Sequence, residues 1–191
     1  MSFGHGGHIR NLARLAGCKA EELLDFSANI NPLGPPDSVR QAIAGNLSAA
    51  VLHYPDPQCL EFCEVIASRF SAPLEQVIVG NGSTEILNVL PRVLGVDRAV
   101  IPAPSYTDYA AAATKAGLDV EYLLMNESDG FAVDWSRVED ALLGQEIVIV
   151  GQPGNPCGST FGPVGLLAVA DRHPSTFFIV DEAFADFIEG Y

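Results

Sequence analysis

Glycines and hydroxyl side chains occur together in residues 80–85, GNGSTE, between an apolar run and a helical pattern. Glycines let a ligand approach the backbone closely, and the free amides at a helix N-terminus attract anions. The hydroxyls of Ser83 and Thr84 would add two donors. The segment therefore predicts a phosphate-binding site, with an ordinary Ser/Thr helix cap as the alternative. Its spacing fits neither the dinucleotide-binding nor the Walker pattern.

Two further apolar runs are followed by side chains suited to a planar ligand. Tyr106 begins a helical pattern after Pro102 and Pro104, and its ring could stack on a flat cofactor; ordinary packing is the alternative. Asn155 lies among the prolines and glycines of residues 151–158, which restrict its amide. The alternative there is an asparagine that supports only its own turn.

Asp181 directly follows the apolar residues 177–180. A carboxylate that emerges from apolar surroundings needs a cationic or hydrogen-bonding partner, and a protonated pyridine nitrogen would serve as one. An aspartate that caps the next turn is the alternative. The four segments together are more specific than any one of them.

These segments need a scaffold, which the pattern of apolar residues predicts. Short strands are expected at residues 77–79, 99–101, 120–124, 147–150 and 177–180. Helices are expected at residues 9–16, 60–70, 83–94, 105–116, 136–143 and 164–172, and a further helix through about Ala50 has Asp37 as its expected N-cap. Pro91 is expected to kink or break one of these helices. Continuous apolar strands separated by helices indicate an α/β fold with a mainly parallel sheet and helices on both faces. Ligands bind such sheets at the carboxyl ends of the strands, where the four segments fall.

Composition narrows the class of protein further. The chain has 191 residues, of which 48% are hydrophobic, and its formal net charge is −14. This acidity disfavours nucleic acid and anionic membranes as partners. No segment reaches the length of a membrane span and residues 1–20 lack a secretory pattern, so the expected compartment is the cytoplasm. The four cysteines match no zinc spacing, and we expect no metal site.

In this order and at these strand ends, the four segments resemble the fold-type I pyridoxal-phosphate enzymes of the aminotransferase class I/II family. The resemblance covers essentially the whole chain, and NPCG at 155–158 and DEAF at 181–184 are its most specific parts. It implies that pyridoxal 5′-phosphate is the cofactor and that Gly82, Ser83 and Thr84 hold its phosphate.

The resemblance also assigns the remaining cofactor contacts. Tyr106 would stack on the ring, Asn155 would bond the phenolic oxygen of the ring and face the substrate, and Asp181 would pair with the pyridinium nitrogen. These three are the expected catalytic residues. Tyr54, in the loop HYPDP, would reach the partner's cofactor phosphate across the interface of a homodimer.

The N-terminal arm narrows the choice within the family. Residues 1–50 are expected to form this arm with part of a small domain, and residues 51–191 the first portion of the cofactor-binding large domain. HGGH at 5–8 and DFSANINPLG at 25–34 are most similar to the threonine-phosphate decarboxylases of cobalamin biosynthesis. That similarity implies decarboxylation of L-threonine O-3-phosphate to aminopropanol phosphate. The residues expected to contact this phosphorylated amino-acid substrate are His5, Gly6 and Asn29, with a frayed tail as the alternative for His5.

Two alternatives stay open: a related aminotransferase, above all histidinol-phosphate aminotransferase, and a non-catalytic cofactor-binding or interaction fragment. His8 replaces an asparagine of the decarboxylases, whereas Phe184 replaces a tyrosine of the aminotransferase and so favours the decarboxylase. The family places its catalytic lysine beyond residues 181–184, but the only lysines here are Lys19 and Lys115. The chain therefore looks truncated before that lysine, and alone it is expected to be inactive.

Overall fold

The computed structural model describes residues 6–190, and these form two compact units, one ending at Ser71 and the other beginning at Ala72. His5, a predicted substrate residue, lies outside the described residues. The boundary expected between residues 50 and 51 concerns the domains of a complete enzyme and stays a prediction.

The first unit is built from helices and loops. Its elements are α1 (Ile9–Ala16), η1 (Ala20–Glu22), α2 (Asp37–Ala50) and α3 (Leu60–Phe70). The three predicted helices of this region are thus confirmed, but Asp37, the expected N-cap, is the first residue of α2, and Pro36 is the N-cap residue. Between α1 and α2 the chain is irregular over residues 27–36, as its prolines predict.

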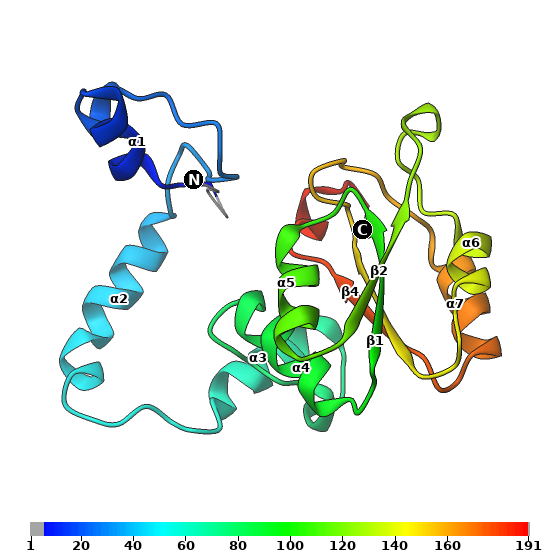
Figure 1. Cartoon of the computed structure of the whole chain (residues 1–191). Coiled ribbons are helices and arrows are strands. Elements are labelled where there is room, and N and C mark those ends of the chain that lie inside the picture. Colours follow the sequence, from blue (N-terminus) through cyan, green and yellow to red (C-terminus); the bar gives the residue numbers. More distant parts are fainter. Residues whose placement is uncertain (1–5, 191) are drawn as a thin grey trace. The chain divides into compact units, whose positions relative to one another are not determined.

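The second unit is a parallel four-stranded sheet with helices (Figure 1). Its elements in chain order are η2 (Leu74–Gln76), α4 (Ser83–Val93), β1 (Arg98–Ala103), α5 (Thr107–Lys115), β2 (Asp119–Leu124), η3 (Glu127–Asp129), α6 (Trp135–Asp140), β3 (Glu146–Gly151), α7 (Pro163–Arg172), β4 (Phe177–Asp181) and η4 (Ala185–Phe187). The spatial order of the strands is β2-β1-β3-β4, and all neighbouring pairs are parallel. The predicted α/β class with a parallel sheet is confirmed.

The alternation of side chains along β1 and β3 divides the core between the two faces of the sheet. Ile101 and Ile149 belong to a cluster with residues of α4 and α5, whereas Val100 and Val148 pack with Val138 of α6. Figure 1 shows α4 and α5 on one side of the sheet and α6 and α7 on the other. The four strand residues are fully buried, and each such side chain stabilises the fold by roughly 1.5–3 kcal/mol relative to exposure. Because β1 and β3 are buried on both faces of the sheet, the residues at their ends are held in fixed positions.

The strand predicted at residues 77–79 is not formed, so that prediction was wrong. These residues are apolar, yet they pair with none of the four strands, and Ile78 is 80% exposed. A strand requires a hydrogen-bonded neighbour, and apolar composition does not supply one. Of the kink or break expected at Pro91, the break is absent: α4 runs through this residue to Val93, and the proline is buried.

A buried carboxylate lies at the amino ends of the strands. Glu146, the first residue of β3, is 1% exposed. Its oxygens accept hydrogen bonds from Leu143 N at 2.8 Å, Gly144 N at 3.0 Å and Thr176 Oγ1 at 2.8 Å, and Arg98 Nη1 lies 3.4 Å away. Burial raises the pKa of this carboxyl, but the hydrogen bonds and the arginine outweigh burial and hold the pKa below its usual value of 4.5. The charge of Glu146 is therefore compensated by groups of the fold itself.

Candidate active site

At the N-terminus of α4, no side chain caps the first amides of the helix, although the Asn81 amide just before it donates to the Glu85 carboxylate. Its N-cap residue, Gly82, has a φ of 78° that favours glycine, and no side-chain oxygen caps the helix. The amides of Ser83 and Thr84 have no partners inside the helix, and the helix dipole adds positive potential there. Both side chains are exposed. The Ser/Thr cap that was the alternative to a phosphate site is not formed by either side chain.

Tyr106 directly precedes α5 and lies beside the start of α4. The Thr84 side chain hydrogen-bonds to the Tyr106 hydroxyl, which in turn donates to Asp108 Oδ2 at 2.8 Å. Burial, followed by the neighbouring Asp108, raises the pKa of Tyr106, so its hydroxyl keeps its proton at neutral pH. The structure thus brings the predicted phosphate segment and the predicted stacking residue together.

Asp181, the last residue of β4, is partly buried, and each of its carboxylate oxygens accepts one hydrogen bond. Ala183 N donates to Oδ1 at 3.0 Å, and the Tyr109 hydroxyl donates to Oδ2 at 2.9 Å. Among residues 6–190, no cationic side chain forms an ion pair with Asp181. The turn-capping alternative accounts for one oxygen only.

Tyr109 is a site residue that the sequence interpretation missed. It is 2% exposed, and its ring meets that of Tyr106 edge to face with 5.6 Å between centroids. Burial, followed by the charge of Asp181, raises the pKa of Tyr109 far above its usual value of 10, so the hydroxyl remains a donor. A signal was present, because Tyr109 follows Tyr106 by three residues and residues at this spacing share one side of a helix.

Asn155 lies in the loop of residues 152–161, which follows β3. Its side chain is partly buried. Cys157 Sγ lies 3.5 Å from Pro104 O, so the loop contacts the segment that leads into Tyr106. Burial raises the pKa of the Cys157 thiol, which keeps it protonated at neutral pH. All four predicted segments therefore meet at the carboxyl edge of the sheet.

The other predicted residues, Gly6, Asn29 and Tyr54, belong to the first unit. A Cβ atom on Gly6 would lie 1.6 Å from Ser27 O, so only glycine fits at this position. Gly7 N donates to Ser27 Oγ at 2.9 Å, which holds the segment of Gly6 against the segment that contains Asn29. Tyr54 is fully exposed.

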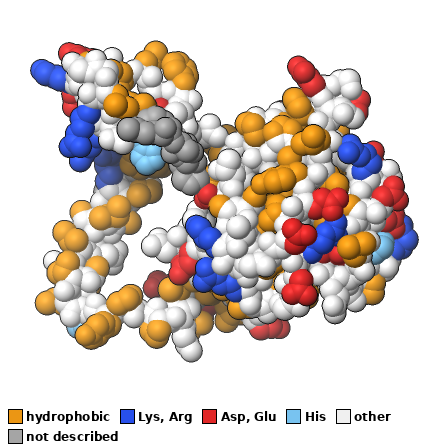
Figure 2. Space-filling model, in the orientation of Figure 1, with side chains coloured by type: hydrophobic (Ala, Val, Ile, Leu, Met, Phe, Trp, Pro, Cys, Tyr) orange, Lys and Arg blue, Asp and Glu red, His pale blue; other side chains and the backbone are white. Residues whose placement is uncertain are grey.

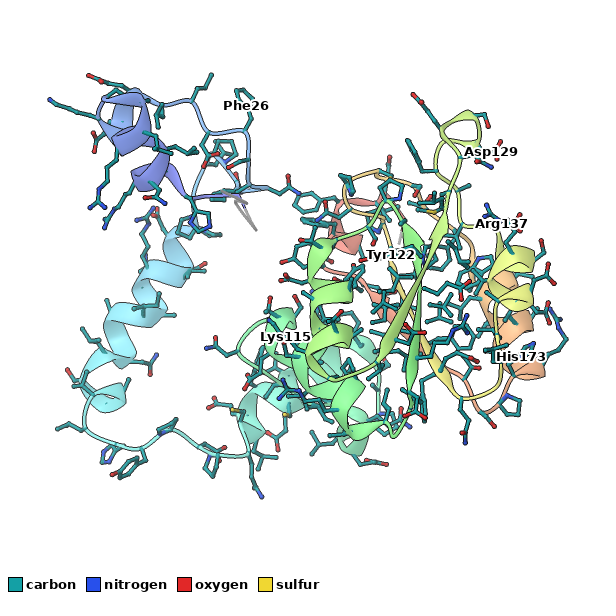
Figure 3. All side chains as sticks on the ribbon, viewed as in Figure 1. Phe26, Lys115, Tyr122, Asp129, Arg137 and His173 are labelled. Atoms are coloured by element: carbon teal, nitrogen blue, oxygen red, sulfur yellow. The ribbon has the colours of Figure 1, made fainter. Side chains whose placement is uncertain are left out.

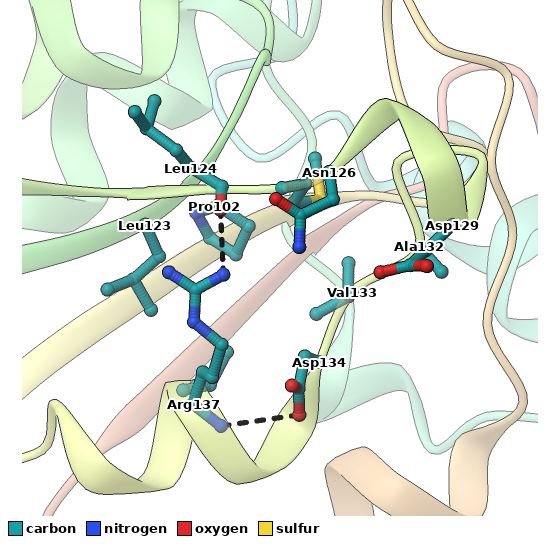
Figure 4. A pocket seen from close by; sticks show the side chains of 11 residues that line it. Pro102, Leu123, Leu124, Asn126, Asp129, Ala132, Val133, Asp134 and Arg137 are labelled. Atoms are coloured by element: carbon teal, nitrogen blue, oxygen red, sulfur yellow. Dashed lines mark hydrogen bonds between the residues drawn. The ribbon is translucent and has the colours of Figure 1, made fainter.

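A separate small cavity lies at the end of β2 (Figure 4). Arg137 Nη1 donates to Leu124 O at 2.8 Å across it, and Asp134 caps α6. The cavity volume is about 40 Å³, which has room for a few water molecules but not for an organic ligand. This cavity therefore does not replace the carboxyl edge of β1, β3 and β4 as the candidate site.

Residues 6–190 contain no group of three or more potential metal ligands, and none of their helices is long and apolar enough to span a membrane.

Of the two lysines, Lys115 lies in the second unit, away from this edge, and Lys19 belongs to the first unit. Lys115 (Figure 3) is the last residue of α5, whose N-cap residue is Tyr106. Lys115 follows Tyr106 by nine positions, which corresponds to roughly 13 Å at about 1.5 Å per residue. Lys19 immediately precedes η1 in the first unit. Neither residue takes part in the contacts that join the four segments.

Comparisons with known proteins agree with this arrangement. The family model described as aminotransferase class I and II matches residues 21–191. A threonine-phosphate decarboxylase from Salmonella typhimurium is 35% identical over 190 residues, which cover 98% of this chain and 52% of the relative. A histidinol-phosphate aminotransferase from Halobacterium salinarum is 33% identical over 194 residues, which cover 99% of this chain and 52% of the relative. The chain thus spans about half the length of these curated relatives.

The solved structure of an L-threonine-O-3-phosphate decarboxylase from Porphyromonas gingivalis has the same fold. It matches with a TM-score of 0.72 and 24% identity, covering 87% of this chain and 49% of that chain. Enzymes of this family depend on pyridoxal phosphate and are generally dimeric. The four strand-end segments, the parallel sheet and the extent of the match lead to one conclusion: the chain belongs to the aminotransferase class I and II family.

Proposed function

We propose that this chain is the cofactor-binding portion of a pyridoxal-phosphate-dependent lyase, and that the whole protein decarboxylates L-threonine O-3-phosphate to aminopropanol phosphate. The observation that carries the proposal is that Asp181 has hydrogen-bond donors but no cationic partner among the described residues. Its carboxylate is oriented by two neutral donors at the open edge of the sheet and has no cationic side-chain partner in residues 6–190. A protonated pyridine nitrogen would supply the missing positive charge.

The residues at this edge fit the parts of the cofactor. The amides and hydroxyls of Ser83 and Thr84 would hold the phosphate, the Tyr106 ring would cover one face of the pyridine ring, and the Asn155 amide would donate to the ring oxygen. When bound, pyridoxal phosphate supplies an electron sink for a bond that breaks at the α-carbon of the substrate. Asp181 would keep the proton on the ring nitrogen, which strengthens that sink.

The N-terminal arm would supply the substrate contacts. His5, Gly6 and Asn29 are the proposed contacts of the phosphorylated substrate, together with Asn155. The tight approach of Gly6 to Ser27 supports this assignment, because it holds a backbone amide segment next to the segment of Asn29. Backbone amides are suitable donors for a phosphate group.

Histidinol-phosphate aminotransferase is the second candidate, and the aminotransferase relative from Halobacterium salinarum favours it. The distinguishing residue is Phe184, where the resemblance expects a tyrosine in the aminotransferase. Phe184 is partly buried and lies against Phe187, with 6.4 Å between ring centroids. Because phenylalanine has no hydroxyl to donate to the ring oxygen, this position supports the decarboxylase.

A homodimer in the cytoplasm is the proposed state of the whole protein. No residue of α2 is buried, and Val39, Ile43 and Leu47 are 44%, 63% and 56% exposed. These three residues recur every four positions and so form one apolar face; Figure 2 shows hydrophobic side chains along this helix. A second copy would cover this face, and the fully exposed Tyr54 would reach its cofactor phosphate.

Cofactor binding is the first test of the proposal. The 191-residue chain should bind pyridoxal 5′-phosphate in a spectroscopic titration, and pyridoxal without the phosphate should bind more weakly. After borohydride reduction, mass spectrometry should detect no pyridoxyl adduct on Lys19 or Lys115, because neither takes part in the contacts of the site. A stable adduct on either lysine would contradict the expectation that neither of them is the catalytic lysine.

The reaction is tested on a full-length protein that contains this chain. L-threonine O-3-phosphate should release carbon dioxide and aminopropanol phosphate in the absence of a 2-oxo acid. Histidinol phosphate with a 2-oxo acid is the matched assay for the aminotransferase. Amino-group transfer without carbon dioxide release would replace the decarboxylase with the second candidate.

A further inference from the structure

Gln152 is a buried polar residue that the proposed function does not use. It directly follows β3 and is 5% exposed. Its carboxamide pairs with the backbone of Phe161 through two hydrogen bonds: Nε2 donates to Phe161 O at 2.8 Å, and Phe161 N donates to Oε1 at 3.0 Å. A side-chain amide thus satisfies both polar groups of one peptide residue, as a neighbouring strand would. We name this pairing of Gln152 with Phe161 the amide clamp.

Both ends of the amide clamp are attached to the core of the second unit. The backbone N–H of Gln152 donates to Asp181 O at 2.8 Å, which continues the β3–β4 ladder by one bond. The ring of Phe161 packs edge to face against Trp135 of α6, with 5.1 Å between centroids. Gln152 therefore connects the strand end that carries Asp181 with a fixed point on the other side of the loop.

Asn155 lies between the two ends of the amide clamp. Inside the loop, Gly158 N donates to Gly154 O at 2.7 Å, and Gly154 N donates to Ser159 O at 2.8 Å. These bonds tighten the loop around Asn155 but do not fix where the loop stands relative to β3. A loop of this length has many closed conformations, and joining its ends removes most of that freedom.

We propose that Gln152 is a positioning residue that sets the place of Asn155 at the carboxyl edge through the amide clamp. The inference rests on the proposed function, which assigns Asn155 to the ring oxygen of the cofactor. The same residue bonds to the backbone of Asp181, so it fixes the Asn155 loop relative to the carboxylate that would face the ring nitrogen. Two contacts on one planar ring require such a fixed spacing.

The first test needs no cofactor. Gln152→Met keeps the length of the side chain but removes both hydrogen bonds of the amide clamp. Thr176→Val is the matched control, because it also removes a buried hydrogen bond, the one to Glu146 at the amino ends of the strands. We expect backbone amides of residues 154–161 to exchange hydrogen about tenfold faster in Gln152→Met and unchanged in the control. Unchanged exchange in Gln152→Met would overturn the proposal.

The second test asks whether the effect of Gln152 passes through Asn155. Gln152→Met should weaken pyridoxal 5′-phosphate binding by about tenfold in the chain that has Asn155, but by less than about twofold in the Asn155→Ala background. Equal losses in the two backgrounds would contradict a positioning role. If the wild-type chain does not bind the cofactor, the proposed function fails, while the exchange rates still decide the role of Gln152.

Discussion

The two carboxylates at opposite ends of the sheet differ in how completely the fold satisfies them. Glu146 is 1% exposed, accepts hydrogen bonds from two backbone amides and a hydroxyl, and lies near Arg98. Asp181 is partly buried and accepts one neutral hydrogen bond on each oxygen. Because a carboxylate has about four acceptor sites, Asp181 keeps capacity at an open edge whereas Glu146 does not. We infer that Glu146 serves the fold and Asp181 serves a ligand.

The direction of the strands explains the difference. At the amino ends, the chain enters β3 through a tight turn at residues 143–145, whose amides close around Glu146. At the carboxyl ends, the chain leaves the strands into loops and helix starts, so residues such as Tyr106, the N-cap residue of α5, gather there. This asymmetry is general for parallel sheets, in which ligands bind at the carboxyl ends.

Removing the buried carboxylate should give the largest effect on stability. Glu146→Leu would leave the Thr176 hydroxyl and the amides of Leu143 and Gly144 without their acceptor and would remove one of the partners of Arg98. We expect a loss of about 3 kcal/mol in the free energy of unfolding, measured in urea. Glu121→Gln is the control, because Glu121 also pairs with Arg98 but is 44% exposed; its loss should stay below about 1 kcal/mol. An equally small loss in both variants would show that burial of Glu146 does not matter.

Neutralising Asp181 should weaken cofactor binding and leave the stability of the fold nearly unchanged. Asp181→Asn keeps the shape and the acceptor for Tyr109 but removes the charge that would face the ring nitrogen. We expect pyridoxal 5′-phosphate to bind about a hundredfold more weakly, equivalent to ~2.8 kcal/mol. The free energy of unfolding should change by less than about 0.5 kcal/mol.

Asp129→Asn, an exposed acid of η3, is the control for Asp181→Asn and should leave cofactor affinity unchanged. In a full-length protein, Asp181→Asn should also abolish turnover. Normal cofactor affinity and turnover in Asp181→Asn would contradict the inference that Asp181 serves a ligand.

Removing the Tyr109 hydroxyl should weaken cofactor binding less than removing the charge of Asp181 does. Tyr109→Phe removes the hydroxyl that orients Asp181 Oδ2 but keeps the buried ring, so we expect cofactor affinity to fall by about tenfold, or ~1.4 kcal/mol. Tyr122→Phe removes a hydroxyl from a tyrosine of β2 that is 54% exposed and serves as the control. If both variants bind the cofactor equally well, the Tyr109 hydroxyl has no part in orienting Asp181.

The two carboxylates also show what the sequence can predict. Asp181 was predicted because it follows a continuous apolar run, and such runs identified all four strands of the sheet. Glu146 and Gln152 gave no signal, because their importance comes from partners distant in the chain, Thr176 and Phe161.

The same limit explains the failure at residues 77–79. Their apolar pattern resembles that of a strand. A strand, however, also needs a hydrogen-bonded partner segment, and the residues of one segment do not show whether a partner is present. Helix bounds depend on local residues and were predicted closely, as α3 and α7 show.

The smallest expected effect is the pH dependence of stability that comes from the ionised form of Glu146. Burial raises the pKa of Glu146, but its hydrogen bonds and Arg98 outweigh burial, so the folded pKa lies below 4.5. A carboxyl with a depressed folded pKa adds stability above its unfolded pKa, and this stability is lost as the pH falls through the folded value. An amide does not titrate, so Glu146→Gln should lose less stability than the wild type as the pH falls from about 6 to about 3. Urea unfolding at both pH values should therefore show the gap between the two proteins narrowing in acid. A gap of constant size would mean that the ionised form of Glu146 contributes nothing, and the contrast with Asp181 would then rest on hydrogen bonds alone.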